Sequence, residues 1–315
     1  MKYQHLFGPV HSRRLGFSLG VDLVPYKYCP LNCVYCEVQK TTHLYVRRQE
    51  FFPPEEITSE LADFLKGKPE LDYITFSGAG EPTLYSKIGE VIGFIKANYP
   101  HYKLALLTNA VLLNHATLRR EILPCDLILP SLDACHQDTF ERINRPHKAL
   151  KAAGLVEGLI KLRQEYRGAI WLEVFIIAGI NDTEEELDCL AKAIRRIKPD
   201  KVQINSLDRP GAEDWVKPAG SRILNRVRNY LAETVSQPVE IIAKVEPGFD
   251  DASIAPDLLG SIQATLSRRP CTAEDLAGIL GIHINEVSKI MRQLKSERKV
   301  SVKREERGVF YSWIS

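Results

Sequence analysis

The strongest constraint on the fold of this chain is a pattern of apolar runs that alternate with segments of helical periodicity. The runs are rich in β-branched residues and end in small or polar ones: Tyr73–Phe76, Lys103–Ala110, Asp126–Ala134, Ala169–Asp182 and Asp200–Asp208. Helical periodicity marks Lys87–Ala97, Leu150–Tyr166 and Thr183–Ile197, the last with Asn181 and Asp182 as N-cap candidates. This alternation predicts an α/β fold, a parallel sheet with outer helices, and a site at the carboxyl ends of its strands.

Length and composition narrow the class of protein. The 315 residues suffice for one large domain and one small one, and 44% apolar residues suit a globular chain. No apolar run approaches the roughly 18 residues of a membrane span, and the N-terminus lacks an export signal, so we expect a cytoplasmic protein. A net charge of +2 is too small to indicate a nucleic-acid partner for the whole chain. Seven cysteines without an export signal make a disulfide framework improbable, so clustered thiols are expected to be reduced and free to bind metal.

Three of these cysteines, Cys29, Cys33 and Cys36, lie within eight residues. Thiolates at this spacing can converge on one soft metal centre, because cysteine sulfur favours zinc, copper(I) and iron–sulfur iron. A zinc site would need a fourth ligand, which His43 could supply. An iron–sulfur cluster usually takes four cysteines, so three would leave one iron with the open position that a reactive site requires. The spacing alone leaves both alternatives open.

A second motif, YITFSGAGEPTL, follows at a distance. Its apolar run Tyr73–Phe76 predicts a short buried strand, and Ser77–Pro82 a glycine-rich turn before a helix. Gly78 and Gly80 would let the backbone approach a ligand closely, and Glu81 would place a carboxylate beside a cationic amine. The alternative interpretation is an ordinary strand-to-helix turn.

The two motifs together resemble the signature of the radical S-adenosylmethionine (radical SAM) enzymes. The first matches C-x3-C-x-aromatic-C, with Tyr35 before the third cysteine, and Ala79–Pro82 is similar to the family's GGEP motif. The resemblance implies that Cys29, Cys33 and Cys36 hold a [4Fe-4S] cluster whose fourth iron is chelated by SAM. It also implies reductive cleavage of SAM to a 5′-deoxyadenosyl radical, with the chemistry carried by the cofactor, and a partial (β/α)6, TIM-like barrel over roughly residues 16–208.

The same resemblance implies a set of SAM contacts at the strand ends. Thr108, Gln203 and the segment 179–181 border this set as further candidates, each with a helix cap or loop hydrogen bond as the alternative. The residues expected to bind SAM are Tyr35, Gly78, Ala79, Gly80, Glu81, Pro82, Asn109, Ser131, Asp133 and Asn205.

Other polar residues and cysteines carry weaker signals. The arginines of HSRR (Arg13, Arg14) and of ERINRP (Arg142, Arg145) could bind a phosphate or carboxylate, or could simply be solvated. The remaining cysteines show no metal-site spacing and are interpreted as structural: Cys125, Cys135, Cys189 and Cys271.

The character of the sequence changes near residue 250. A linker rich in Gly, Pro and acidic residues is expected at Pro247–Asp257, followed by helices at Leu258–Arg268, Thr272–Leu280 and Asn285–Arg298. Two strands, KVSVKR and GVFYSWI, then predict a hairpin. This order resembles a winged helix-turn-helix, so we expect a barrel domain at 1–250 and a winged-helix domain at 251–315. Ten Lys and Arg against seven Asp and Glu in residues 256–315 give the second domain a modest basic bias.

The resemblance leaves the substrate open. The motifs are most similar to the wyosine-type tRNA imidazoguanosine synthases, which implies a tRNA base as substrate, but that group carries a second cysteine cluster upstream and here no cysteine precedes Cys29. One alternative is an activase that generates a glycyl radical on a partner protein. Another is an iron–sulfur, redox- or SAM-sensing DNA-binding regulator. Expected partners are SAM, an electron donor such as flavodoxin or ferredoxin, and RNA, DNA or protein on the winged helix.

Overall fold

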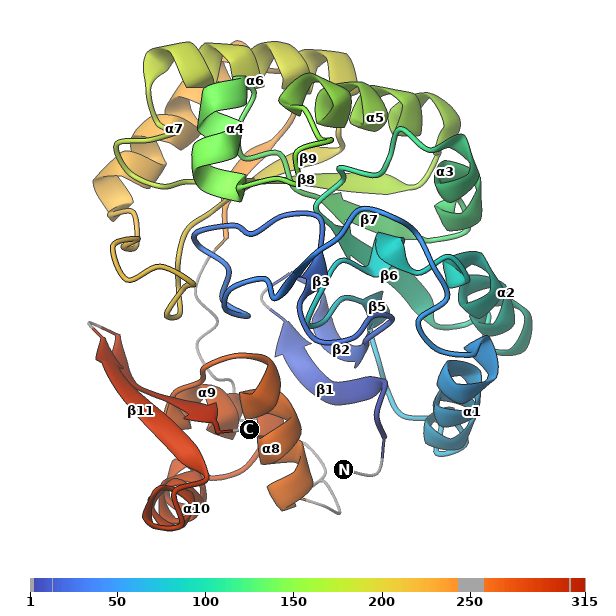
Figure 1. Ribbon diagram of the computed structural model, residues 1–315, viewed down its shortest axis with the longest axis vertical. Helices are drawn as coiled ribbons and strands as arrows, with labels where there is room; N and C mark the ends of the chain where they lie inside the picture. Colours follow the sequence, from blue (N-terminus) through green and yellow to red (C-terminus); the bar gives the residue numbers. More distant parts are fainter. Residues whose placement is uncertain (1–2, 13, 243–257, 306, 315) are drawn as a thin grey trace.

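The structure of the chain is a computed structural model that describes residues 3–12, 14–242, 258–305 and 307–314. Its centre is an eight-stranded sheet in the order β1-β2-β5-β6-β7-β8-β9-β10, curved with its helices outside (Figure 1). The strands are β1 (Leu6–Ser12), β2 (Gly16–Val21), β5 (Tyr73–Phe76), β6 (Lys103–Thr108), β7 (Leu127–Pro130), β8 (Ala169–Phe175), β9 (Lys201–Asn205) and β10 (Val239–Ile241).

Six consecutive strands, from β2 through β9, are parallel, which confirms the predicted partial (β/α)6 barrel. Most of their buried aliphatic side chains form one core with the outer helices, while Ala105, Leu127 and Leu129 belong to a separate, smaller cluster. The helices are α1 (Pro54–Leu65), α2 (Ile88–Asn98), α3 (Ala116–Ile122), α4 (Gln137–Asn144), α5 (Ala152–Glu165), α6 (Glu184–Ile197) and α7 (Ser221–Thr234), with a short 3-10 helix at Pro82–Leu84. Among the described helices none has the length and apolar character to cross a membrane.

The predicted caps of α6 were wrong. Its N-cap is Thr183, whose hydroxyl accepts from the backbone of Glu186. Asn181 is instead fully buried, and its side-chain oxygen accepts a hydrogen bond from Ile177 N at 2.8 Å. Asp182 accepts from Gly179 N at 2.6 Å. Both side chains therefore accept hydrogen bonds from the backbone of the turn that precedes the helix. A side chain that is used in this way is not available to cap the helix.

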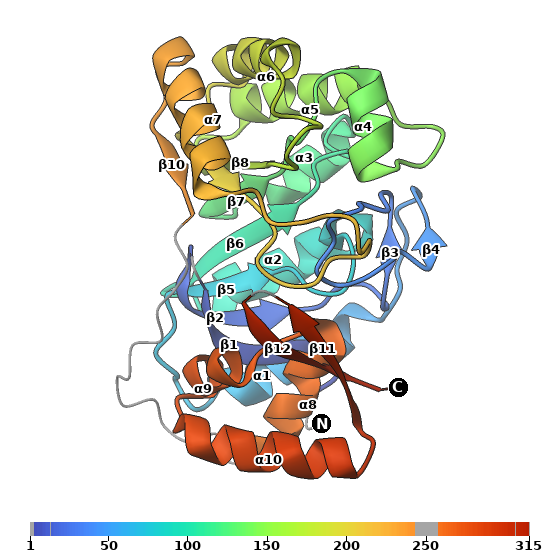
Figure 2. The ribbon, with the colours of Figure 1, turned by 90° about the vertical axis from the view of Figure 1, so that its left-hand side faces the viewer.

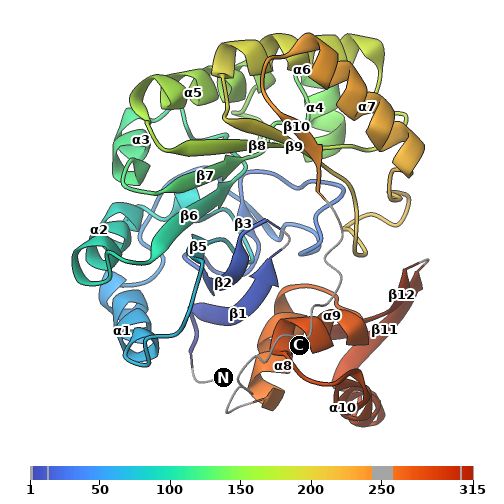
Figure 3. The same cartoon turned by 180° about the vertical axis from the view of Figure 1, so that it is seen from behind.

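The two ends of the sheet are additions that the sequence did not predict. β1 pairs antiparallel with β2, and β10 extends the sheet in parallel beyond β9. Helix α7 was not predicted because it buries only Val227 and Leu231, which gives a weak apolar pattern. Strand β10 was not predicted because it has only three residues. Since β1 and β10 are not paired with each other, the barrel is open along one side, as Figure 3 shows from behind.

The C-terminal elements have the predicted order and lie against β1. They are α8 (Leu258–Arg268), α9 (Ala273–Leu280), α10 (Ile284–Ser296) and the antiparallel hairpin β11 (Val300–Glu305) and β12 (Gly308–Trp313). Thr272 and Asp275 form a capping box that starts α9. Buried aliphatic side chains of these elements make a separate small core, and α10 lies on the side away from the barrel (Figure 2). The predicted linker and the boundary at 250 lie outside the described residues.

Candidate active site

The three clustered cysteines lie in the long loop between β2 and α1. Cys29 belongs to the short strand β3 (Tyr28–Cys29), which pairs with β4 (His43–Leu44), and Cys36 N donates to Cys33 O at 3.1 Å. All three are half-buried, and none of them forms a disulfide. The loop is thus a fixed platform that carries three thiols.

Each of the three sulfurs faces one nitrogen donor. Asn109 Nδ2 lies 3.5 Å from Cys29 Sγ, Asn144 Nδ2 lies 3.3 Å from Cys33 Sγ, and Lys27 Nζ lies 3.1 Å from Cys36 Sγ. Such donors stabilise sulfur as thiolate, the form that binds metal. Sequence reasoning missed Lys27 as a sulfur partner and did not consider Asn144.

Burial acts on the thiols in the opposite direction. It raises the pKa of Cys29 to about 12, and it raises the pKa of Cys33 well above its ordinary value of 9.0. Without a cation the buried thiols would hold their protons, so a bound metal centre would offset the cost of ionising them.

The donor set fits a cluster better than a single ion. Across the described residues, no group of three or more His, Cys, Asp or Glu side chains is arranged to hold one metal ion. His43, the fourth ligand considered for zinc, stacks on Tyr28 with ring centroids 4.2 Å apart and bonds Thr42 at 3.0 Å. In a cluster each thiolate binds a different iron, so the sulfurs need not meet at one point, and N–H donors to sulfur are typical of such sites.

The glycine-rich turn after β5 lies directly against this loop. Lys27 N donates to Ala79 O at 3.1 Å, and Glu81 N donates to Tyr28 O at 3.0 Å. Asp22, at the end of β2, accepts from Ala79 N at 2.8 Å. The two sequence motifs are therefore joined by backbone hydrogen bonds into one unit.

Gly78 is required by this packing. Its φ is +139°, and a Cβ built there would lie 1.5 Å from Asp22 Oδ1. We predict that Gly78→Ala destabilises the protein by at least about 2 kcal/mol and displaces the turn, because the backbone strain and the clash cannot both be relieved. The measurement is chemical denaturation of the wild-type protein and the variant.

Gly93→Ala is the matched control for this prediction. Gly93 is an exposed residue inside α2, and a Cβ added there would meet no atom within 4 Å. The substitution should gain up to about 1 kcal/mol from the higher helix propensity of Ala. Equal stabilities of the two variants would contradict the role given to Gly78.

Glu81 is buried, and its carboxylate is surrounded by donors of its own chain. Oε1 accepts from Thr83 Oγ1 and Thr108 Oγ1, each at 2.6 Å, and Oε2 accepts from Asn109 N at 2.8 Å. Burial raises the pKa of this carboxyl, and these hydrogen bonds oppose the rise. Glu81 therefore fixes Asn109, the donor to Cys29. Its predicted contact with the amine of SAM stays a prediction.

The strand-end residues form a second network beside the cysteines. Asp133 accepts hydrogen bonds from the Tyr35 hydroxyl, from Asn144 Nδ2 at 2.8 Å and from Phe175 N at 3.0 Å. Burial raises the pKa of Asp133 to about 6 despite these donors. The Tyr35 ring stacks on Phe175 at 3.9 Å. Asp133 and Tyr35 thus lie together next to Cys33.

Of the other predicted strand-end residues, Asn205 and Ser131 contact Glu173, whereas the side chain of Gln203 is hydrogen-bonded to a different carboxylate. Asn205 Nδ2 donates to Glu173 Oε2 at 3.2 Å, and Ser131 forms an isolated β-bridge with Glu173. Gln203, by contrast, donates at 2.7 Å to Glu240 of β10. Glu173 was missed, although a single carboxylate within the apolar strand AIWLEVF was a usable signal.

A cavity of about 450 Å³ opens beside this network. Its lining includes Tyr35 and Cys36 from the cysteine loop, and Arg14, Glu173 and Asn205 from the barrel. Arg14 is ion-paired with Glu173. Further lining comes from the C-terminal elements: Arg269, Glu274, Asp275, Gly278, Ile279 and Arg307. The arrangement offers a partly open, partly polar space in which a molecule could meet both the cysteine loop and the C-terminal unit.

Comparison with known proteins agrees with this geometry. The family model of the radical SAM superfamily matches residues 23–194. A protein named GTPase Obg from Brachyspira hyodysenteriae is 33% identical over 95% of this chain, which spans only 44% of that relative's length. A UPF0026 protein from Methanocaldococcus jannaschii is 33% identical over 76% of this chain and 75% of its own.

A similar fold is seen in a solved structure, a radical SAM methyltransferase from Sphaerobacter thermophilus. It superposes with a TM-score of 0.57 at 16% identity and covers 71% of this chain and 65% of its own. At this identity the likeness extends to the fold alone.

Proposed function

Because the chain belongs to the radical SAM superfamily of enzymes, we propose that Cys29, Cys33 and Cys36 hold a [4Fe-4S] cluster used for reductive cleavage of SAM. The observation that carries the proposal is the set of three half-buried thiols, each with its own nitrogen donor. When bound, the cluster would supply the electron that splits the sulfonium and yields a 5′-deoxyadenosyl radical. The electron itself must come from a donor such as flavodoxin or ferredoxin.

This chain's own residues would then position SAM. Lys27, Asn109 and Asn144 hold the sulfurs, and the Gly78–Pro82 turn is fixed beside them by Asp22 and Tyr28. We propose that SAM lies between this turn and the strand ends. The contacts proposed for it are Tyr35, Gly78, Ala79, Gly80, Glu81, Pro82, Asn109, Ser131, Asp133 and Asn205.

Binding of SAM should depend on the metal centre, because the open iron is the proposed ligand of the amino and carboxylate groups. The test is equilibrium dialysis of SAM against anaerobically reconstituted protein and against the same protein stripped of iron. We expect at least about tenfold weaker binding after iron removal, a loss of one good interaction. Equal affinity in both preparations would contradict the proposed binding mode.

The substrate is a separate proposal. A tRNA base, as in the wyosine-type group, has one supporting observation: Lys289, Arg292 and Lys295 are exposed on α10, which faces away from the barrel (Figure 2). We propose that α8 to β12 form a winged helix, with α10 as its exposed basic helix. The β11–β12 hairpin contacts the barrel domain instead, because Lys303 forms an ion pair with Asp214.

The enzyme proposal is favoured over a DNA-binding sensor. Lys303 and Arg307, at the hairpin, are both used in ion pairs with the barrel, whereas a nucleic-acid-binding wing needs such charges free. The cavity also extends from Cys36 to the C-terminal unit, which suits a substrate. A glycyl-radical activase would need a protein segment to enter this same cavity.

A further inference from the structure

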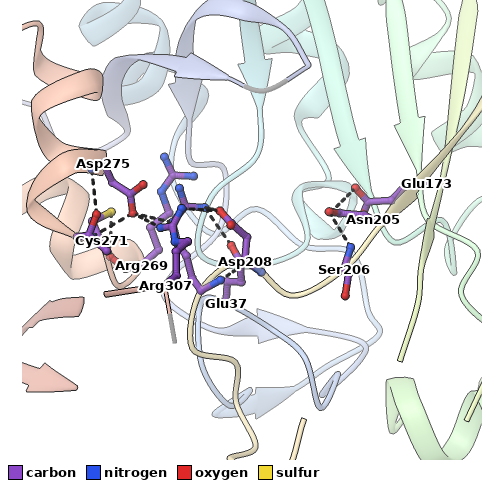
Figure 4. Close-up of polar contacts among 11 residues, drawn as sticks. Glu37, Glu173, Asn205, Ser206, Asp208, Arg269, Cys271, Asp275 and Arg307 are labelled. Atoms are coloured by element: carbon purple, nitrogen blue, oxygen red, sulfur yellow. Dashed lines mark hydrogen bonds and ion pairs between the residues drawn. The ribbon is translucent and has the colours of Figure 1, made fainter. Parts of the chain in front are cut away.

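The cavity between the barrel and the C-terminal unit contains four arginines, Arg14, Arg209, Arg269 and Arg307. Three are neutralised by carboxylates of the protein. Arg14 pairs with Glu173, and Arg209 lies 3.2 Å from Glu37 Oε2. Arg307 lies 3.0 Å from Asp208 Oδ2 (Figure 4). Asp275 is shared, as it pairs with both Arg209 and Arg307. These contacts hold the C-terminal unit against the cysteine loop.

Arg269 is different. Within the described ranges, its guanidinium has no carboxylate within 4.0 Å and no hydrogen-bond acceptor, although it lines the cavity. Burial and the neighbouring charge of Arg209 lower the pKa of Arg269. Arg269 is half-buried, and the carboxylates of Glu37 and Asp275 oppose this fall in its pKa without forming an ion pair with it. A bound anion in direct contact with the guanidinium would offset the remaining cost of its burial.

The backbone holds Arg269 in place. Arg269 N donates to Thr265 O at 3.1 Å, which continues the last turn of α8. Two residues later, Cys271 exchanges backbone hydrogen bonds with Tyr311 of β12, at 3.0 and 2.8 Å. The segment is therefore pinned on both sides, so the position from which the guanidinium enters the cavity is fixed before a ligand binds.

Most residues that line the cavity are not among the proposed SAM contacts. Of those residues only Tyr35 and Asn205 line the cavity. Its volume of about 450 Å³ is that of a small-molecule site. Arg14, Arg209 and Arg307 are already paired with carboxylates of the protein. Glu274 also lines the cavity, and among the described residues it has no such ion pair, but it is exposed to solvent.

We propose that this cavity is the substrate site and that Arg269 binds a carboxylate or phosphate group of a small-molecule substrate. The inference rests on the proposed function, because Cys36, a proposed cluster ligand that lines the same cavity, marks where the radical would form. The C-terminal unit is thereby a part of the active site, supplying its anion-binding residue. A guanidinium suits both anions, since it can form two parallel hydrogen bonds to either.

The test is calorimetric titration of reconstituted full-length protein, at low ionic strength, with inorganic phosphate and with succinate. We expect the wild-type protein to bind one or both, and Arg269→Gln to weaken that binding by about tenfold or more. Binding of phosphate alone assigns a phosphorylated substrate, and binding of succinate alone a carboxylic acid. Arg269→Lys keeps the charge and should lose less, which a purely structural role would not produce.

Arg222→Gln is the matched control, because it removes the same charge from an exposed position of α7, outside the cavity. Its anion affinity should stay within about twofold of wild type. Equal affinities in wild type and Arg269→Gln, or no binding by wild type, would overturn the inference. So would tRNA binding that survives Arg269→Gln, is lost in Arg292→Gln, and comes without affinity for either small anion.

Measurement of SAM cleavage on the same preparations separates this inference from the proposed function. If SAM is cleaved and Arg269→Gln binds anions like wild type, only the inference about Arg269 fails. If Arg269→Gln loses anion binding and no preparation cleaves SAM under reduction, the anion site stands and the proposed function fails.

Discussion

Replacing any one of Cys29, Cys33 and Cys36 with Ala is expected to reduce SAM cleavage by at least about 1000-fold, because the variant loses a ligand of the reactive group itself. Each sulfur has its own nitrogen donor in the structure, so none duplicates the role of another. Iron and sulfide content after anaerobic reconstitution should fall together with activity. The measurements are iron analysis and quantification of 5′-deoxyadenosine.

Cys189→Ala is the control for these variants. Cys189 lies in α6, is half-buried like the three clustered cysteines, and has no part in their loop. It should retain its iron and its activity. Full iron content in Cys29→Ala, Cys33→Ala or Cys36→Ala would exclude the cluster assignment for that residue, whatever the activity.

The second large effect is expected at Arg268, which joins the C-terminal unit to the motif after β5. Arg268 Nε donates to Asp22 Oδ2 at 2.7 Å, and the other oxygen of Asp22 holds Ala79 N at 2.8 Å. Burial raises the pKa of Asp22, and Arg268 opposes that rise. Arg268→Met should destabilise the protein by about 3 kcal/mol, because it leaves a buried carboxylate without its partner.

A double-mutant cycle tests this account. Asp22→Asn combined with Arg268→Met removes both charges, so the pair should lose less stability than the sum of the single variants. The loss in Arg268→Met should also depend on pH. It should be smallest in acid, where Asp22 of the folded protein is protonated with or without Arg268, and grow as pH rises past the folded-state pKa of Asp22, which lies above the ordinary value of 3.8. Additive effects and a pH-independent loss would contradict the coupling.

The barrel could be predicted from the sequence because its signals are local. Tyr73–Phe76 is a strand with the predicted bounds, and β6, β7, β8 and β9 begin within a residue of their predicted starts. The same holds for the helix Leu258–Arg268 and for the hairpin. Alternation of apolar runs and amphipathic helices needs no knowledge of distant contacts. Helix α7 and strand β10 were missed, since one is mostly polar and the other very short.

The site was only partly predictable, because much of it depends on contacts between distant residues. The spacing of the cysteines is visible in the sequence, but the donors Asn109 and Asn144 come from other strand ends and helices. The pair of Asp22 and Arg268 is separated by 246 positions. Arg269 was counted only as part of a modest basic bias, and no pattern indicated that it enters a cavity with Cys36. The roles of such residues can be recognised only once the position of the C-terminal unit against β1 is known.

The measurement that tests the central claim most directly is reduction of the anaerobically reconstituted protein in the presence of SAM, with the nucleoside products separated by chromatography. We predict 5′-deoxyadenosine in the wild-type protein and in Cys189→Ala, and none above background in Cys29→Ala, Cys33→Ala or Cys36→Ala. A reconstituted protein that carries iron and sulfide, binds SAM and yields no 5′-deoxyadenosine under reduction, with phosphate, succinate or tRNA present or absent, would contradict the claim.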